Sequence, residues 1–123
     1  MKITRKFEWD AAHHLNLPYK SKCIGQHGHS YVIEVTLEGP VNEYGMVLDF
    51  YDFDQWVNNV SFDHTDLSKN FYFKDINPTA ENIVTYLKRE LDQTLPERIL
   101  GPDVKIQKIR VYETRKSYAE ETW

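Results

Sequence analysis

The sequence is poor in cysteine and has no long apolar run. Its 123 residues include one cysteine, Cys23, so a scaffold of intramolecular disulfides is excluded. No segment approaches the roughly 18 consecutive apolar residues that a membrane-spanning helix needs. The first ten residues, MKITRKFEWD, contain no apolar stretch that resembles a signal peptide. We therefore expect a cytoplasmic protein with no membrane partner.

An excess of positive charge is also absent. Lys and Arg number 15 against 19 Asp and Glu, which gives a net charge of −4. This balance does not favour nucleic acid as the main partner. Internal repeats and linkers rich in Pro, Gly or Ser are missing too, so residues 1–123 are expected to form a single domain. The chain does have 41% hydrophobic residues and 14% aromatic residues, enough for a core at this length.

Alternation of apolar and polar residues predicts strands. Residues 2–14 carry apolar side chains at odd positions, with only Arg5 dissenting, and residues 27–38 alternate in the same way. A hairpin-like connection then predicts a third strand at Met46–Phe50. A last strand is expected near Val104–Glu113. Its apolar positions change parity part-way along, at Ile106 and Ile109, and a bulge would explain this shift.

Helical spacing occurs in two segments between these strands. Apolar residues at i, i+3, i+4 and i+7 predict a short amphipathic helix over residues 53–60, with Asp49 or Asp52 as its N-cap. Thr79 is the expected N-cap of a longer helix that ends before Pro96. The order β-β-β-α-α-β favours an α+β domain, in which two helices cover one face of a four-stranded antiparallel sheet. Such a sheet has exposed edges, which favours oligomerisation.

All five histidines lie in the first 64 residues. His27 and His29 are separated by one glycine at the start of a strand. Residues at i and i+2 point the same way, with Cα atoms roughly 6.5–7 Å apart, so both imidazoles can reach one metal ion. Parity places His13, rather than His14, on the apolar face of the first strand, where it can meet them. Three neutral imidazoles favour zinc and leave a fourth position for water or substrate.

Three further features of the sequence each have more than one possible chemical role. Cys23 fits a fourth zinc ligand, an inert buried thiol, or a catalytic thiolate beside an open zinc site, and spacing alone does not choose among them. Asp63 and His64 fit either a proton-transfer pair or a solvated loop pair. Glu113 ends the last strand. It is either exposed or, if buried, suited to hold the N–H edge of a guanine-like heterocycle.

Six motifs occur together in the order found in one enzyme family. They resemble the 6-pyruvoyltetrahydropterin synthase superfamily over nearly the whole chain. Within it, the gap of three residues between Cys23 and His27 is similar to that of the bacterial 6-carboxytetrahydropterin synthases, whereas the pyruvoyl-forming enzymes typically have a longer gap. The motifs are Phe7-Glu8-Trp9-Asp10-Ala11-Ala12-His13-His14-Leu15, Cys23-x-x-x-His27-Gly28-His29, Leu48-Asp49-Phe50, Asp63-His64, Asn77-Pro78-Thr79-x-Glu81 and Tyr112-Glu113-Thr114.

The resemblance implies a role for each candidate residue. Cys23 matches the family's catalytic base, Asp63 and His64 match its proton-relay pair, and Glu113 matches the carboxylate that anchors the pterin and takes part in the relay. His14 stands where relatives often carry Arg, which puts an anion-binding role there in doubt. The zinc ligands are matched by His13, His27 and His29.

The resemblance also implies a fold, an assembly and a reaction. The tunnelling fold is an antiparallel sheet with two helices on one side. Three subunits form a barrel, and two trimers stack into a homo-hexamer with active sites at subunit interfaces. The implied reaction converts 7,8-dihydroneopterin triphosphate to 6-carboxy-5,6,7,8-tetrahydropterin, acetaldehyde and triphosphate, on the way to 7-deazapurines such as queuosine. The alternatives are a 6-pyruvoyltetrahydropterin synthase and a non-catalytic zinc protein, whose site one cysteine and three histidines close.

Overall fold

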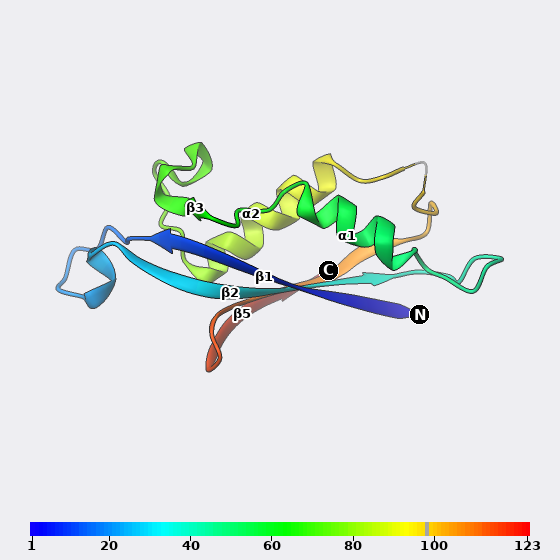
Figure 1. Cartoon of the computed structure of the whole chain (residues 1–123), viewed down its shortest axis with the longest axis horizontal. Helices are drawn as coiled ribbons and strands as arrows, with labels where there is room; N and C mark the ends of the chain where they lie inside the picture. Colours follow the sequence, from blue (N-terminus) through cyan, green and yellow to red (C-terminus); the bar gives the residue numbers. More distant parts are fainter. Residues whose placement is uncertain (98) are drawn as a thin grey trace.

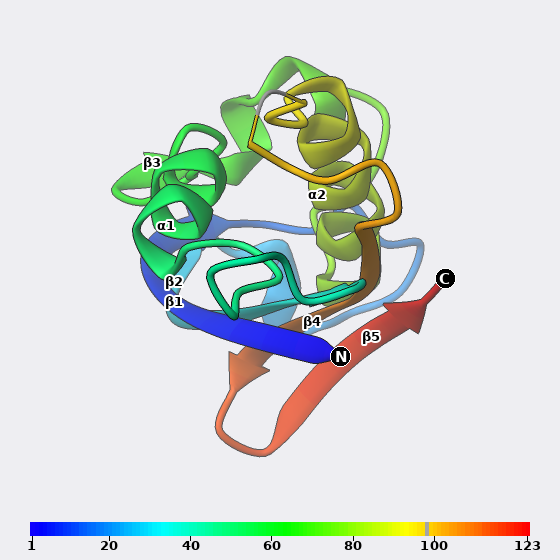
Figure 2. The same ribbon diagram turned by 90° about the vertical axis from the view of Figure 1, so that its right-hand side faces the viewer.

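The computed structural model describes residues 1–97 and 99–123. In it, one five-stranded sheet carries two helices on one of its faces (Figures 1 and 2). The strand order is β3-β1-β2-β4-β5. Four strands pair antiparallel, and the short β3 pairs parallel with β1. The strands are β1 (Lys2–His13), β2 (His27–Glu38), β3 (Thr65–Asp66), β4 (Lys105–Thr114) and β5 (Ser117–Thr122).

The first two strands pair along their whole length. Their register runs from Lys2 opposite Glu38 to His13 opposite His27, without a shift. Odd-numbered residues of β1 from Phe7 onward are buried under the helices, as the alternation predicts. This ladder therefore ends at two of the candidate metal ligands.

The two helices begin at side-chain caps. In α1 (Phe50–Asn58) the cap is Asp49, whose carboxylate accepts a hydrogen bond from Tyr51 N. In α2 (Ala80–Gln93) the cap is Thr79, as predicted. Within the described part of the chain, neither helix is long and apolar enough to cross a membrane. Short 3-10 turns, η1 (Lys22–Ile24), η2 (Leu67–Lys69) and η3 (Phe71–Phe73), lie in the connections. The helices place these side chains in the core: Phe53, Trp56, Val57, Ile83, Val84, Leu87 and Leu91.

The predicted third strand at Met46–Phe50 is wrong. Val47 and Leu48 are buried, but they lie in the loop that leads into α1, and Phe50 is already helical. A short apolar segment can cover one end of the core whether it is a loop or a strand, so periodicity does not distinguish a loop from a strand here. The sheet instead gains β3 and β5, and the predicted order is corrected to β-β-α-β-α-β-β.

The expected irregularity in the last strand is confirmed. Thr36 of β2 pairs with Lys108, but the next residue, Leu37, pairs with Ile106, so β4 has one extra residue at this point. Ile106 and Ile109 are both buried. The bulge therefore lets two residues of opposite parity face the same core.

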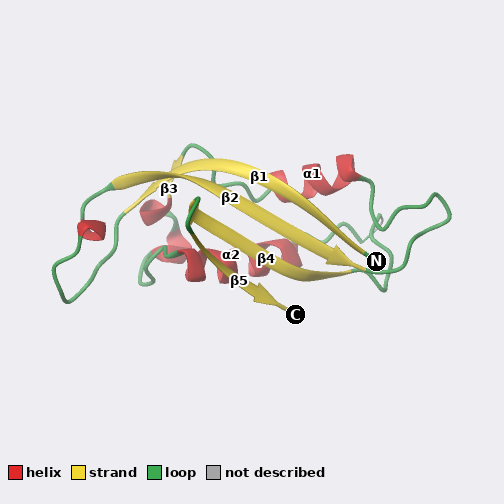
Figure 3. Ribbon diagram, turned by 90° about the horizontal axis from the view of Figure 1, so that it is seen from below, coloured by secondary structure: helices red, strands yellow, loops and turns green. Residues whose placement is uncertain are grey.

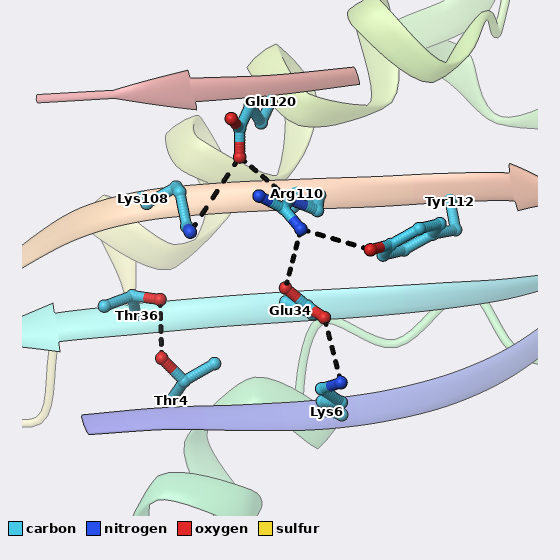
Figure 4. Close-up of polar contacts among 8 residues, drawn as sticks. All are labelled: Thr4, Lys6, Glu34, Thr36, Lys108, Arg110, Tyr112 and Glu120. Carbon is cyan, nitrogen blue, oxygen red and sulfur yellow. Dashed lines mark hydrogen bonds and ion pairs between the residues drawn. The ribbon is translucent and has the colours of Figure 1, made fainter. Parts of the chain in front are cut away.

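The other face of the sheet carries no helix, as Figure 3 shows. We call it the open face. Its centre is Glu34, whose carboxylate lies 3.2 Å from Lys6 Nζ and 3.8 Å from Arg110 Nη1 (Figure 4). Arg110 in turn donates to Glu120 and to the Tyr112 hydroxyl. The centre of the open face is thus charged and internally paired, while the residues that the helices bury lie on the other side of the sheet.

Candidate metal and catalytic site

Three imidazoles meet where β1 ends and β2 begins. His13 is opposite His27 in the ladder, and His29 is opposite Ala11, so all three point to the helix-covered face. One nitrogen from each ring lies within 4.8 Å of the other two. His13 is 1% exposed, and its Nε2 lies 2.9 Å from His27 Nε2. The parity argument that selects His13 over His14 agrees with this geometry.

Backbone carbonyls fix the tautomers of two of these rings. His13 Nδ1 lies 2.8 Å from Pro78 O, and His27 Nδ1 lies 2.6 Å from Gly25 O. A carbonyl oxygen only accepts, so each Nδ1 must carry the proton. The two Nε2 atoms, 2.9 Å apart, then present lone pairs to one another. In a tetrahedral zinc site with Zn–N of about 2.0–2.1 Å, two ligand nitrogens lie about 3.3 Å apart, so the pair fits a shared metal ion.

The third ring, that of His29, has a nitrogen without a hydrogen-bond partner. His29 Nε2 is buried and makes no hydrogen bond within the described residues. The nearest carboxylate oxygen, on Glu113, lies 3.7 Å away. A buried nitrogen without a partner costs free energy that coordination would recover. Together the three nitrogens form a donor set of the kind that zinc prefers.

Burial favours the metal-binding protonation state of two of the three imidazoles. Desolvation lowers the pKa of His13 and of His29, and this effect outweighs the nearby negative charge of Glu113, which raises both. Burial therefore favours the neutral form of these two imidazoles. Burial also raises the pKa of Tyr31, and the Glu113 charge adds to that shift. The Tyr31 hydroxyl oxygen lies 3.1 Å from His13 Nδ1. The N–H of His13 Nδ1 therefore has two acceptors, Tyr31 Oη and Pro78 O.

Glu113 connects the triad to an open hollow. Its side chain is 30% exposed and lies beside His29, one residue before the end of β4. The hollow of about 230 Å³ is bounded by Glu113, by the first residues of α2 and by the start of β5. A ligand held by Glu113 would therefore lie close to His29.

Cys23 lies outside the group of metal-ligating atoms. It belongs to η1 and is half-buried, and its carbonyl oxygen accepts a hydrogen bond of 2.8 Å from Leu15 N. Among residues 1–97 and 99–123, the group close enough to share a metal contains the three imidazoles and not the Cys23 sulfur. The structure thus places Cys23 in the loop beside the triad, without bringing it into the triad.

Asp63 and His64 are attached to the outer edge of β1. Asp63 Oδ1 accepts a hydrogen bond of 2.8 Å from Asp10 N, and His64 N donates to Asp10 O at 2.7 Å. His64 has a φ of 59°, an uncommon conformation for a residue with a side chain. Its imidazole is 83% exposed and 3.5 Å from Asp63 Oδ2. Within the described part of the chain, neither side chain hydrogen-bonds or pairs with the triad.

Residues that the sequence analysis did not assign to the site also shape it. Tyr31 continues the parity of His27 and His29, and that signal could have placed it under the triad. Pro78 contributes only its main-chain carbonyl oxygen, which every residue has, so the identity of the side chain does not predict this contact with His13. His14 points elsewhere, with its Nδ1 3.0 Å from Gln26 Oε1.

Comparison with known proteins finds one family along the chain. A family model described as 6-pyruvoyl tetrahydropterin synthase matches residues 2–122. The chain is 30% identical to the 6-carboxy-5,6,7,8-tetrahydropterin synthase of Rickettsia felis, over 98% of this chain and 99% of that protein. It is also 30% identical to the 6-pyruvoyl tetrahydrobiopterin synthase of Homo sapiens, over 91% and 84%. The structure of 6-pyruvoyl tetrahydropterin synthase from Caenorhabditis elegans superposes with a TM-score of 0.85 at 27% identity, covering 100% of this chain and 95% of that one.

Proposed function

The chain belongs to the 6-pyruvoyl tetrahydropterin synthase family, and we propose that it is a zinc-dependent 6-carboxy-5,6,7,8-tetrahydropterin synthase. The substrate would be 7,8-dihydroneopterin triphosphate, and the products 6-carboxy-5,6,7,8-tetrahydropterin, acetaldehyde and triphosphate. The reaction is that of a carbon–carbon lyase, and its product would supply 7-deazapurine (queuosine) synthesis. The observation that carries the proposal is the group of three imidazoles, one buried and two half-buried, with two opposed lone pairs, beside Glu113.

The chain's own residues have separable tasks in this proposal. Glu113 accepts hydrogen bonds from the N–H edge of the pterin and so directs the substrate side chain toward the imidazoles. The Cys23 thiolate takes a proton from that side chain, and His64, oriented by Asp63, delivers or accepts another. The three imidazoles would hold zinc, which would supply a Lewis acid that stabilises negative charge on the substrate.

We further propose that the active sites lie between subunits of a homo-hexamer. Two observations support this assembly. His64 is exposed at the β3 edge of the sheet, away from the triad of its own chain. At the other edge, β5 pairs with β4 on one side only, and among the described residues its outer side has no partner strand; exposed sheet edges are ready to pair with another chain. A triad from one subunit would then be completed by His64 of its neighbour.

A mixing experiment tests the shared site. Cys23→Ala and His64→Ala are each expected to lose turnover. If the two residues of one site come from different subunits, co-refolded hybrids regain part of the activity, because some sites contain both intact residues. Hybrids that stay as inactive as the separate variants, while forming mixed oligomers, would show that one subunit supplies both.

The runner-up is a 6-pyruvoyltetrahydropterin synthase acting on the same substrate. The relatives of both names are 30% identical to this chain, so their names do not decide. The gap of three residues between Cys23 and His27 supports the carboxy reaction. Product analysis after incubation with the substrate decides between them: released acetaldehyde supports the proposal, and turnover without acetaldehyde rejects it.

A non-catalytic zinc protein is the remaining alternative, and metal analysis of Cys23→Ala separates it from an enzyme. In the catalytic proposal this variant keeps its zinc and loses turnover, which fits the position of Cys23 outside the triad. In a structural site closed by one cysteine and three histidines, the same variant loses zinc. His14→Ala is the matched control, because His14 lies next to His13 but points away from the triad, and it should keep both zinc and turnover.

A further inference from the structure

The turn before α2 contacts both parts of the candidate site. The Pro78 carbonyl accepts the hydrogen bond from His13 Nδ1 at 2.8 Å. The preceding side chain, Asn77, makes two hydrogen bonds to the main chain of Asn16: its Oδ1 accepts from Asn16 N at 2.8 Å, and its Nδ2 donates to Asn16 O at 3.0 Å. One turn therefore holds a candidate metal ligand and the loop that follows it.

This turn is itself firmly attached to α2. The Asn77 carbonyl accepts hydrogen bonds of 2.8 Å from Thr79 N and from Asn82 Nδ2. Thr79 caps the helix by accepting from Asn82 N at 3.2 Å. Pro78 is buried and has a restricted φ, which limits the freedom of the turn further. The support on which His13 and Asn16 rest is therefore fixed to a helix of the core.

Asn16 is adjacent to the residue that holds Cys23. Leu15 N donates to the Cys23 carbonyl at 2.8 Å, which closes the loop between β1 and β2 on itself. Asn16 and most of this loop are exposed, so few packing contacts fix its main chain. The two hydrogen bonds between Asn77 and Asn16 therefore tie this part of the loop to the turn before α2, beyond the point where His14 N donates to Ser68 Oγ at 2.9 Å.

We propose that Asn77 is a positioning residue that fixes the Cys23 loop relative to the imidazole triad. Because Pro78 orients His13 from the same turn, Cys23 and His13 share one support. Loss of the Asn77 side chain frees the loop but leaves the Pro78 carbonyl in place. Turnover should fall while zinc binding persists. The catalytic part of this inference rests on the proposed role of Cys23 as the base.

The chain offers close controls for Asn77→Ala. Asn16→Ala removes a side chain but keeps the main-chain N–H and C=O that Asn77 binds, so it should behave like the wild type. Asn42→Ala removes an amide that accepts hydrogen bonds from Tyr44 N and Met46 N. Asn42 belongs to the loop between β2 and α1, which lies at the opposite end of the sheet from the loop between β1 and β2 (Figure 1). It reports the general effect of losing two side-chain to main-chain hydrogen bonds.

Three measurements are made on each zinc-loaded variant: steady-state turnover of 7,8-dihydroneopterin triphosphate, zinc content, and the rate of alkylation by iodoacetamide. Cys23 is the sole cysteine, so alkylation reports one thiol. For Asn77→Ala we expect kcat to fall at least tenfold with KM within threefold, because misplacement of a catalytic group is costly. Its alkylation should be at least threefold faster and its zinc content unchanged. Both control variants should stay within twofold of the wild type.

Several outcomes would overturn the inference. They are an Asn77→Ala variant within twofold of the wild type in both kcat and alkylation, an equal effect in Asn16→Ala or Asn42→Ala, or loss of zinc together with turnover. If Asn77→Ala does not fold, Asn77→Asp decides. It keeps the bond from Asn16 N but opposes a carboxylate to Asn16 O, and we expect at least a threefold loss of kcat. If the wild type itself does not turn over the pterin, the proposed function fails, while alkylation still tests the Asn77 contact.

Discussion

Removal of a single hydroxyl group, in Tyr31→Phe, should weaken zinc binding without removing a ligand. The Tyr31 hydroxyl is fully buried and lies 3.1 Å from His13 Nδ1. Pro78 O remains at 2.8 Å from the same nitrogen, so the N–H keeps one acceptor. A typical hydrogen bond contributes a net of about 0.5–1.5 kcal/mol. If all of it favours the ligating orientation of His13, the zinc Kd should rise roughly 2- to 13-fold.

The assay is competition for Zn²⁺ between the protein and a chelator of known affinity. Tyr112→Phe is the matched control, because the Tyr112 hydroxyl accepts from Arg110 Nη1 at 3.1 Å on the open face, away from the triad. The control should bind zinc as the wild type does. A Tyr31→Phe Kd within twofold of the wild type would refute the idea that this hydroxyl orients His13. A loss beyond a hundredfold would refute the magnitude, because one hydrogen bond cannot account for it.

Two other perturbations test the triad. Chelation of zinc should lower the melting temperature, because a ligand at a thousandfold its Kd stabilises the folded state by about 4 kcal/mol. His27→Ala should abolish that shift, and an equal shift in this variant, measured by differential scanning fluorimetry, would place the metal elsewhere. Lower pH should destabilise the metal-free protein. Burial lowers the pKa of His13 and His29, so below their ordinary pKa of about 6.5 the unfolded chain binds more protons than the folded one. The free energy of unfolding in urea should then be smaller at pH 5.5 than at pH 7.5, and equal values would contradict the burial argument.

The sequence predicts the position of the three imidazoles well because the first two strands are regular. In an unbroken alternation, parity alone decides which face a side chain occupies, and this places His13 with His27 and His29. The same reasoning finds the bulge, because Ile106 and Ile109 must both reach the core. The role of the three histidines as metal ligands stays a prediction, as do the roles of the other candidate residues.

Other features leave no comparable signal in the sequence. β5 escapes prediction because an edge strand needs no buried face, and five of its six residues are exposed. The loop around Val47 has the composition of a strand, but its apolar side chains cover one end of the core from a loop. The orientation of His64 depends on a φ of 59° and on the hydrogen bonds that His64 and Asp63 make to Asp10, which lies far back in the chain. Long-range contacts of this kind are set by tertiary structure rather than by local pattern.

The two contacts of His13 differ in how far along the chain they reach, and this bears on the order of folding. His13 and His27 are 14 residues apart and meet as soon as the β1–β2 ladder closes. His13 and Pro78 are 65 residues apart and meet only when α2 docks on the sheet. Closing the longer loop costs more chain entropy and is expected later. A folding chain would therefore bring its imidazoles together first and orient His13 afterwards, so early zinc binding and final site geometry are separate kinetic events.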